Sequence, residues 1–224
     1  MDNSNLHEYF SRSYTTGTDI WTHVPTDREI IKACNRFIEG EQKMVLDIGC
    51  GRGLLDFELA RKNQRVLGID VIPDLIKKNN EEVINHRLIG TCGFVLGSGL
   101  DIPFSDSSFD YIIDSGFMHH LYSVEYETYK NEVTRVLKNG GFIFQATYSL
   151  KTSMLLGIRP HTENRNLEKY GLHYHFFDQD ELLSIFEPEF TLREHIEEIF
   201  DSRSDPGERL TYNICVWQKN SYLV

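Results

Sequence analysis

The chain has 224 residues, of which 23 are basic and 34 acidic, so its formal net charge is −11 at pH 7. Its 40% hydrophobic and 25% charged residues are typical of a globular protein with a buried core. Binding to nucleic acids or anionic lipid surfaces needs clustered Lys and Arg, so the acidic balance argues against both kinds of partner. No run approaches the roughly 18 apolar residues of a membrane-spanning helix.

The first residues of the chain and the spacing of its cysteines bear on the cellular compartment in which we expect the protein. The first residues, MDNSNLHEYF, lack the basic run and apolar stretch of a signal peptide. The four cysteines are far apart, with no CxxC pair, so neither a zinc site nor a disulfide framework is expected. They are Cys34, Cys50, Cys92 and Cys215. We therefore expect a reduced, cytoplasmic protein without a bound metal.

Residues 1–25 are polar but rich in aromatics, and we expect an N-terminal arm or lid there, followed by one domain over residues 26–224. Thr26 as N-cap and Glu29 three residues later form a capping box, which predicts a helix that ends near Gly40. Its apolar face has helical spacing and consists of Ile30, Cys34, Phe37 and Ile38.

An alternation of strands and helices follows. Short apolar runs predict strands at residues 44–48, 65–69, 93–96, 111–113 and 142–147. Helical patterns separate them at residues 54–62, 73–84 and 126–137, the last stopping at Asn139-Gly140. Continuous apolar strands separated by helices predict an α/β fold with a doubly wound, mostly parallel sheet and helices on both faces.

The pattern changes after residue 150. Residues 148–177 form an insertion, of which we expect residues 151–177 to be irregular, and residues 178–186 are predicted to be a helix. Two closing strands are expected at residues 190–196 and 210–218. Because these alternate polar and apolar residues more strongly, they are typical of an edge or antiparallel pair.

Three alternate glycines lie in the turn after the first strand: Gly49, Gly51 and Gly53. Glycine suits backbone with positive φ and positions where a ligand approaches the main chain. The dinucleotide fingerprint GxGxxG is absent, because its third glycine would fall on Leu54 or Asp56. A phosphate-binding P-loop is absent too, since no Gly-Lys-Ser/Thr follows.

The sequence DIGCGRG at residues 47–53, with Asp70 at the end of the second strand, resembles class I S-adenosylmethionine-dependent methyltransferases. The resemblance spans roughly residues 30–150. It includes IPF at 102–104, SFDYII at 108–113 and LKNGG at 137–141, where Asn139 replaces a proline. It implies a Rossmann-like methyltransferase fold with seven strands, the last antiparallel, and S-adenosyl-L-methionine as cofactor.

The resemblance also implies a set of cofactor-binding residues. Asp47, Gly49 and Gly51 would line the methionine part, Asp70 would bind the ribose hydroxyls, and Asp101 would meet the adenine. Close relatives often carry Asp at Ser98, and Asp101 is a candidate substitute. The whole set is Asp47, Gly49, Cys50, Gly51, Gly53, Asp70, Val71, Ser98, Gly99, Leu100, Asp101 and Ser115.

Each of these assignments has an alternative. The glycines could be simple turn residues, and Asp70 could be the N-cap of the helix that starts at Pro73. Cys50 is interpreted as a small filler rather than a nucleophile. His173 and His175 could be two ligands on one strand face, but they lack a third ligand at metal spacing.

The loop after the fourth strand contains His119 and His120, which could act as general bases because imidazole titrates near neutral pH. Packing or capping of the loop is the alternative that we favour. The aromatic residues of the arm could form a lid over the sulfonium or pack on the sheet edge. The predicted acceptor-binding residues are Tyr9, Tyr14, Trp21, Tyr148, Arg159 and His161.

The sequence therefore predicts an S-adenosylmethionine-dependent methyltransferase that acts on a small or medium-sized acceptor by in-line methyl transfer. A protein methyltransferase is one alternative. Others are a sensor or partner subunit that binds the cofactor without catalysis, and an enzyme that binds nicotinamide or another nucleotide. We expect a small-molecule acceptor and no nucleic-acid or membrane partner, while the oligomeric state and the atom methylated do not follow from the sequence.

Overall fold

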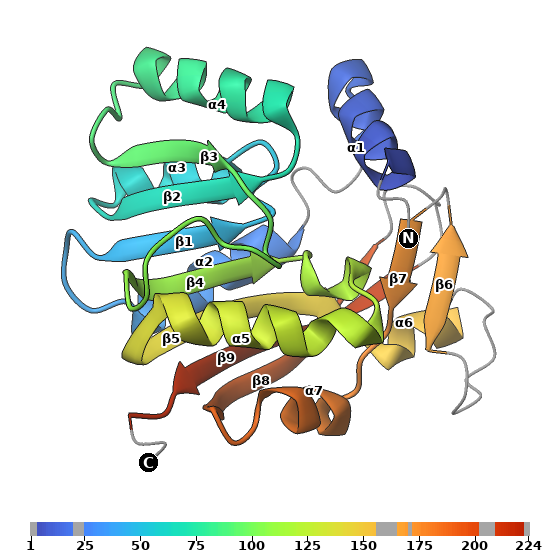
Figure 1. Cartoon of the computed structure of the whole chain (residues 1–224). Helices are drawn as coiled ribbons and strands as arrows, with labels where there is room; N and C mark the ends of the chain where they lie inside the picture. Colours follow the sequence, from blue (N-terminus) through green and yellow to red (C-terminus); the bar gives the residue numbers. More distant parts are fainter. Residues whose placement is uncertain (1–3, 20–24, 156–164, 170–171, 202–208, 222–224) are drawn as a thin grey trace.

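The computed structural model describes residues 4–19, 25–155, 165–169, 172–201 and 209–221. Its main sheet has seven strands in the order β3-β2-β1-β4-β5-β9-β8 (Figure 1). Strands β1 to β5 are parallel, and β9 is antiparallel to both of its neighbours. The strands are β1 (Met44–Ile48), β2 (Arg65–Asp70), β3 (Cys92–Leu96), β4 (Phe109–Ser115), β5 (Leu137–Tyr148), β8 (Phe190–Asp201) and β9 (Arg209–Lys219). The predicted doubly wound sheet with an antiparallel last strand is confirmed.

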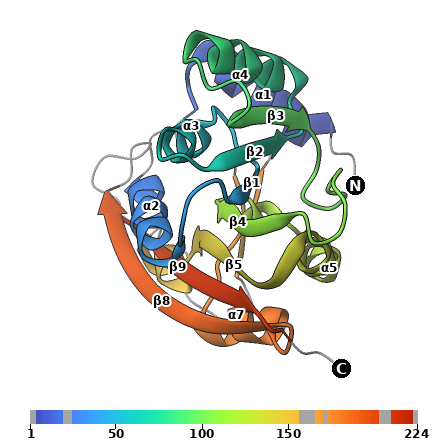
Figure 2. The same ribbon diagram turned by 90° about the vertical axis from the view of Figure 1, so that its left-hand side faces the viewer.

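Helices cover both faces of this sheet (Figure 2). The first face carries α2 (Pro25–Phe37), α3 (Leu54–Arg61) and α4 (Pro73–Asn85). The second face carries α5 (Tyr126–Val136) and α7 (Gln179–Phe186). Alternate residues of each strand point to opposite faces, so Val45 belongs to the first core and Leu46 to the second. Among the described residues, no helix is both long and apolar enough to cross a bilayer.

Two local expectations are wrong. Helix α2 already begins at Pro25, so Thr26 lies inside its first turn and is not the N-cap. Helix α5 ends at Val136, and the next residue begins β5, so Asn139-Gly140 lies within a strand rather than after a helix. Gly140 accommodates this with a φ of 76°, a left-handed conformation that glycine adopts without strain.

The N-terminal arm and the insertion contain regular structure that the sequence analysis did not predict. The arm includes α1 (Ser4–Thr16). The insertion, expected to be irregular, contains α6 (Leu150–Leu155) and a hairpin of β6 (Asn166–Lys169) with β7 (Leu172–His175). Short 3-10 turns at Met118–His120 (η1) and Ser123–Glu125 (η2) precede α5.

The carboxyl ends of β1 to β5 point toward one side of the molecule, where α1, α6 and the β6–β7 hairpin gather (Figure 1). The chain leaves β1 toward β2 and β3 on one side, and it returns through β4 and β5 on the other. Sheets of this kind usually bind their ligand where the strand order reverses, which here is the region between the ends of β1 and β4, and we call this region the crevice.

Candidate cofactor and acceptor sites

The glycine turn that follows β1 lies beside the crevice, at the carboxyl end of this strand. Gly49, Gly51 and Gly53 have φ values of 69°, 52° and 68°, a region that other residues rarely adopt. The amide of Gly49 donates to the carbonyl of Ile69 at 2.9 Å, which ties the turn to the end of β2. A Cβ on Gly51 would lie 2.8 Å from the Tyr14 hydroxyl of α1, so a side chain at this position would displace the tyrosine.

Asp70 lies beside this turn at the end of β2 and is 9% exposed. Its carboxylate accepts hydrogen bonds from the amides of Gly51 and Ile72, both at 3.1 Å. The N-cap of α4 is Ile72, so the alternative that Asp70 caps this helix is wrong. Asn79 of α4 is buried and donates to the Gly51 carbonyl at 2.7 Å, which fixes the turn from its other side.

Two buried carboxyl groups, Asp47 of β1 and Asp56 of α3, lie beneath the glycine turn. Gly68 of β2 is opposite Asp47, and a Cβ there would lie 2.7 Å from Asp56 Oδ1. Burial, and then the neighbouring Asp56, raises the pKa of Asp47 far above its usual range; burial also raises the pKa of Asp56. Because two adjacent buried carboxylates repel each other, we infer that the pair holds one proton at neutral pH.

The turn between β3 and β4 contains the residues that the resemblance assigns to the adenine. The hydroxyl of Ser98 accepts from the Leu100 amide at 3.1 Å, and the Asp101 amide donates to the Ser98 carbonyl at 3.2 Å. A Cβ on Gly99 would lie 2.6 Å from the ring of Phe117, so glycine allows the two loops to meet. The side chain of Asp101 is exposed, and Val71 is 38% exposed at the end of β2.

The Arg52 side chain joins the glycine turn to the N-terminal arm. Its guanidinium donates to both carboxylate oxygens of Asp19 at 2.7 and 2.6 Å and to the Tyr14 carbonyl at 3.0 Å. Its Cζ also lies 5.4 Å from the centroid of the Tyr14 ring. Arg52 therefore ties the glycine turn to α1 and to the residue Asp19 that follows this helix.

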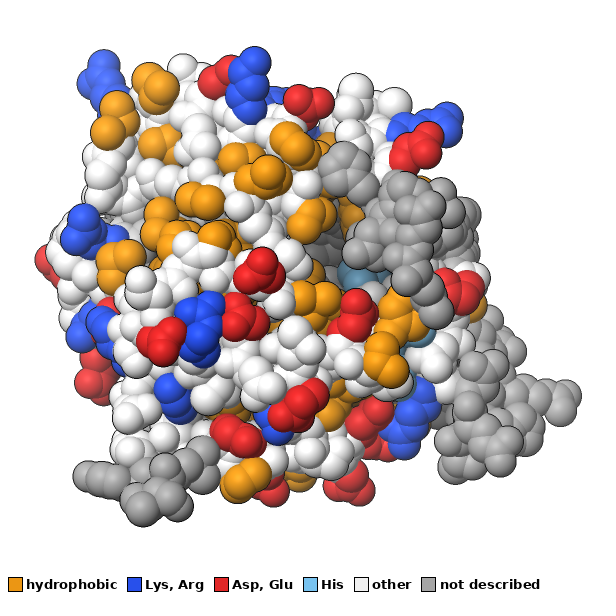
Figure 3. Space-filling view, in the orientation of Figure 1, with side chains coloured by type: hydrophobic (Ala, Val, Ile, Leu, Met, Phe, Trp, Pro, Cys, Tyr) orange, Lys and Arg blue, Asp and Glu red, His pale blue; other side chains and the backbone are white. Residues whose placement is uncertain are grey.

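A cluster of aromatic and histidine rings lies past the end of β4. His119 packs against Tyr148 with ring centroids 4.4 Å apart, and His120 packs against Tyr174 of β7 at 4.8 Å. Phe10 of α1 packs edge-on against His120 at 5.7 Å. Figure 3 shows a hollow on this side of the molecule, with histidine side chains inside it.

The two histidines are neutral at pH 7. Burial lowers the pKa of His120 to about 4, and burial together with the neighbouring His120 lowers that of His119 further. Nδ1 of His120 is 2.8 Å from the carbonyl oxygen of His173. A carbonyl only accepts, so Nδ1 must carry the proton and Nε2 must present a lone pair.

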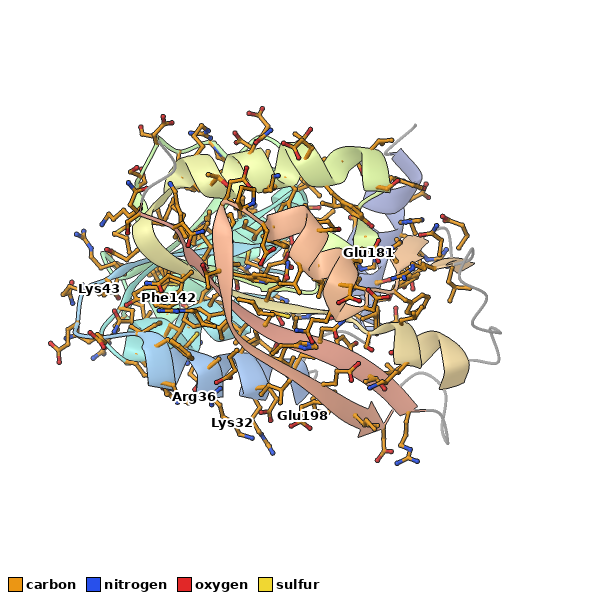
Figure 4. The ribbon with its side chains drawn as sticks, turned by 90° about the horizontal axis from the view of Figure 1, so that it is seen from below. Lys32, Arg36, Lys43, Phe142, Glu181 and Glu198 are labelled. Carbon is orange, nitrogen blue, oxygen red and sulfur yellow. The ribbon has the colours of Figure 1, made fainter. Side chains whose placement is uncertain are left out.

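The loop that carries these histidines is shaped by Asp114, the last buried residue of β4. Its carboxylate accepts from the Phe117 amide at 2.8 Å and from the Tyr129 hydroxyl of α5 at 2.7 Å. The β6–β7 hairpin is held in turn by Glu181 of α7, whose side chain faces it (Figure 4). Glu181 pairs with His175 at 2.9 Å and with Arg165 at 2.8 Å.

The structure brings most of the predicted site residues to one edge of the sheet. Among the predicted acceptor residues, Tyr9 and Tyr14 lie on α1 and Tyr148 ends β5, while Trp21, Arg159 and His161 lie outside the described residues. Burial raises the pKa of the Cys50 thiol, which agrees with its interpretation as a filler. No group of three metal-ligating side chains occurs in the described part of the chain.

Sequence reasoning missed four polar residues of this edge: Asp19, Asp27, Asp56 and Asn79. Each of these side chains interacts with a residue from another part of the chain. For example, the Ser115 hydroxyl donates a hydrogen bond to Asp27 at 3.2 Å. The only sequence signal was the polar character of Asp56 and Asn79 on the otherwise apolar faces of amphipathic helices.

Known proteins are similar to this chain in the region that contains the glycine turn. Residues 45–141 match a family model described as a methyltransferase domain. Sterol 4-C-methyltransferase strm-1 of Caenorhabditis elegans is 31% identical over 100 residues, which are 43% of this chain and 28% of that protein. A phosphoethanolamine N-methyltransferase of Triticum aestivum is 33% identical over 104 residues, 46% of this chain and 20% of that protein. The chain thus spans less than a third of either relative.

Solved structures share the whole fold. The 1,6-didemethyltoxoflavin-N1-methyltransferase of Burkholderia thailandensis, solved with 1,6-didemethyltoxoflavin and S-adenosylhomocysteine, has a TM-score of 0.77 and 20% identity. The alignment covers 97% of this chain and 88% of that one.

The fold and the glycine turn define a class of protein: a Rossmann-like α/β domain with a glycine-rich turn between β1 and α3. Residues 45–141 of this domain are similar to a methyltransferase domain, a class of enzyme whose methyl donor is S-adenosylmethionine. The residues present fit that cofactor. Gly51 lets the turn approach the Tyr14 hydroxyl closely, Asp70 supplies a carboxylate at the end of β2, and no cation is needed because the cofactor lacks phosphate.

Proposed function

We propose that this chain is a methyltransferase that transfers a methyl group in line from S-adenosylmethionine to a small or medium-sized acceptor. One observation carries the proposal: the glycine crevice opens at the same sheet edge as the His119–Tyr148 and His120–Tyr174 ring pairs. The named acceptors of the matched relatives, a sterol and phosphoethanolamine, support a small molecule over a protein or nucleic acid.

We propose for the cofactor-binding residues the roles that the resemblance implies. When bound, S-adenosylmethionine supplies an electrophilic methyl group on a positively charged sulfur. A carboxylate offers about four acceptor positions. The two amides that hold Asp70 in place are therefore compatible with additional bonds from ribose hydroxyls. The Ser98–Asp101 turn and Val71 would contact the adenine, and Asp47 with the glycine turn would contact the methionine part.

His120 is the proposed contact for the reacting group of the acceptor. Its Nε2 lone pair accepts a hydrogen bond from an N–H or O–H and orients the donor atom toward the methyl group. With a pKa of about 4, the imidazole is a weak base, so its main role is orientation rather than full proton removal. His119 is buried, and we propose that it supports the ring of Tyr148.

The walls of the acceptor site are proposed to come from three segments: α1 with Tyr9 and Tyr14, the end of β5 with Tyr148, and the hairpin with Tyr174. Flat aromatic walls exclude water and favour an acceptor with an apolar body. Trp21, Arg159 and His161 remain candidates. We further propose a cytoplasmic location without nucleic-acid or membrane partners, supported by the net charge of −11 and four free thiols.

The test is product formation. The purified protein is incubated with S-adenosylmethionine and a panel of amines, thiols, phenols and carboxylic acids, and S-adenosylhomocysteine is measured by mass spectrometry. We expect turnover with at least one acceptor, and a roughly hundred-fold lower kcat/KM for His120→Ala. The control is His86→Ala, because His86 is the C-cap of α4 and lies at the end of this helix that is farther from the crevice. Tight cofactor binding without turnover on the panel or on cell extract would instead favour the non-catalytic alternative.

A further inference from the structure

Asp27 lies in the first turn of α2, and its carboxylate points toward the carboxyl end of β4. There the hydroxyl of Ser115 donates to Asp27 Oδ1 at 3.2 Å. The pairing of β1 with β4 aligns Asp47 with Ile113, and two further residues along each strand bring Ser115 level with Gly49. Asp27 therefore lies at the crevice, next to the strand end that faces the glycine turn.

The surroundings of Asp27 are acidic. Burial, and to a lesser extent Glu58 of α3, raises the pKa of Asp27 to about 6, although the Ser115 hydrogen bond opposes this shift. Asp47 of β1 and Asp56 of α3 also interact electrostatically with Asp27. Among the described residues, Tyr212 of β9 also interacts electrostatically with Asp27.

No ion pair to Asp27 occurs within the described ranges. A mostly buried carboxylate with one neutral donor and several negative neighbours is unfavourable by itself. The arrival of a cation with N–H donors would reverse this, because a charge-assisted hydrogen bond would replace the repulsion.

We propose that Asp27 is the counter-ion of the ammonium group on the amino-acid end of the bound cofactor. This inference rests on the proposed function. The hydrogen-bond donors favour the ammonium over the sulfonium. The ammonium has N–H groups whose hydrogen bonds a carboxylate can accept, whereas the sulfonium has none. The adjacent carboxylate of the cofactor is repelled by Asp27, so the same side chain also fixes which end of the amino-acid part faces α2.

Three ligands separate the possible roles of Asp27. S-adenosylmethionine carries both the ammonium and the sulfonium, S-adenosylhomocysteine carries only the ammonium, and 5′-methylthioadenosine carries neither. Their affinities are measured by isothermal titration calorimetry at pH 7.5 for the wild type and for Asp27→Asn. Asparagine has the same shape and can still accept from Ser115, so the fold is expected to persist.

For Asp27→Asn we expect roughly ten- to hundred-fold weaker binding of the first two ligands and unchanged binding of 5′-methylthioadenosine. The matched control is Glu29→Gln, which removes the same charge from the same helix. Glu29 pairs with Lys32 at 2.7 Å, and Lys32 lies on the outer side of α2 (Figure 4). This control should leave all three affinities unchanged.

A pH series adds a second readout. The wild-type affinity for S-adenosylhomocysteine should fall as pH decreases through about 6, where Asp27 becomes protonated. In Asp27→Asn, only the weaker pH dependence due to Asp47 and Asp56 should remain.

The possible outcomes are distinct. Loss of affinity for S-adenosylmethionine alone would assign Asp27 to the sulfonium and overturn the inference. Equal weakening of all three ligands would show a structural role, and no weakening would show that Asp27 does not contact the ligand; either result overturns the inference alone. A wild-type protein that binds none of the three overturns the proposed function as well.

Discussion

The guanidinium of Arg52 forms a two-pronged ion pair with the carboxylate of Asp19, with N–O distances of 2.7 and 2.6 Å. The Asp19 side chain is 4% exposed and that of Arg52 is 25% exposed, so solvent screens this pair only partly. Arg52 lies between two glycines of the turn, and Asp19 follows α1. The loop proposed to bind the cofactor thus also holds the helix that covers it.

Replacing Arg52 with Ala should release α1. We expect faster amide hydrogen exchange in residues 4–19 and about ten-fold weaker binding of S-adenosylhomocysteine, because Tyr14 loses its anchor. Arg52→Lys retains the charge without the two-pronged geometry and should give an intermediate result. If amide hydrogen exchange in α1 is the same in Arg52→Ala as in the wild type, then Arg52 does not hold this helix in place.

Gly51→Ala tests the close approach of α1 to the turn. The new Cβ would lie 2.8 Å from the Tyr14 hydroxyl, in addition to the strain of a φ of 52°. Gly90→Ala is the matched control, since Gly90 also has a positive φ of 86° but nothing within 4 Å of a Cβ. Both variants should lose about 1 kcal/mol of unfolding free energy from backbone strain.

Only Gly51→Ala should also weaken the binding of S-adenosylhomocysteine, by about ten-fold or more, as measured by calorimetry. If the two alanine variants bind the ligand equally well, then the space beside Gly51 is not part of the site.

Asp56→Asn should make the protein more stable at alkaline pH. The pKa values of Asp47 and Asp56 are raised in the folded state by burial, so the folded protein binds protons more tightly than the unfolded chain. Wild-type stability therefore falls as pH rises above about 4, where these carboxyls ionise in the unfolded chain.

A neutral Asn at position 56 removes part of this loss of stability, because it has no carboxyl group that can ionise. We expect Asp56→Asn to match the wild type near pH 4 and to exceed it by on the order of 2 kcal/mol at pH 8 in urea denaturation. Asp74→Asn, at an exposed position on α4, is the control. A stability difference that does not vary with pH would contradict a shared proton.

The parts of the fold that the sequence predicted share one property: their signal is local. The apolar run Met44–Ile48, the glycine turn and the helix that starts at Pro73 depend on residues within a few positions of one another. The β6–β7 hairpin was missed because strands of four residues are too short to show a period.

The site residues that were missed depend instead on long-range contacts. Asp19 meets Arg52 across 33 positions of sequence, and Asp27 meets Ser115 across 88. No local pattern in a single sequence identifies such partners. The glycines in the sequence indicate where the proposed cofactor site lies, whereas the carboxylates around this turn are found only from the tertiary structure.

The most direct test of the central claim is the binding of S-adenosylhomocysteine to the wild type and to Asp70→Ala by isothermal titration calorimetry at pH 7.5. The account predicts one site per chain with micromolar or tighter affinity in the wild type. It also predicts at least ten-fold weaker binding in Asp70→Ala, with circular dichroism confirming that both are folded. A folded wild-type protein that releases no heat, or an Asp70→Ala variant that binds as tightly as the wild type, would contradict it.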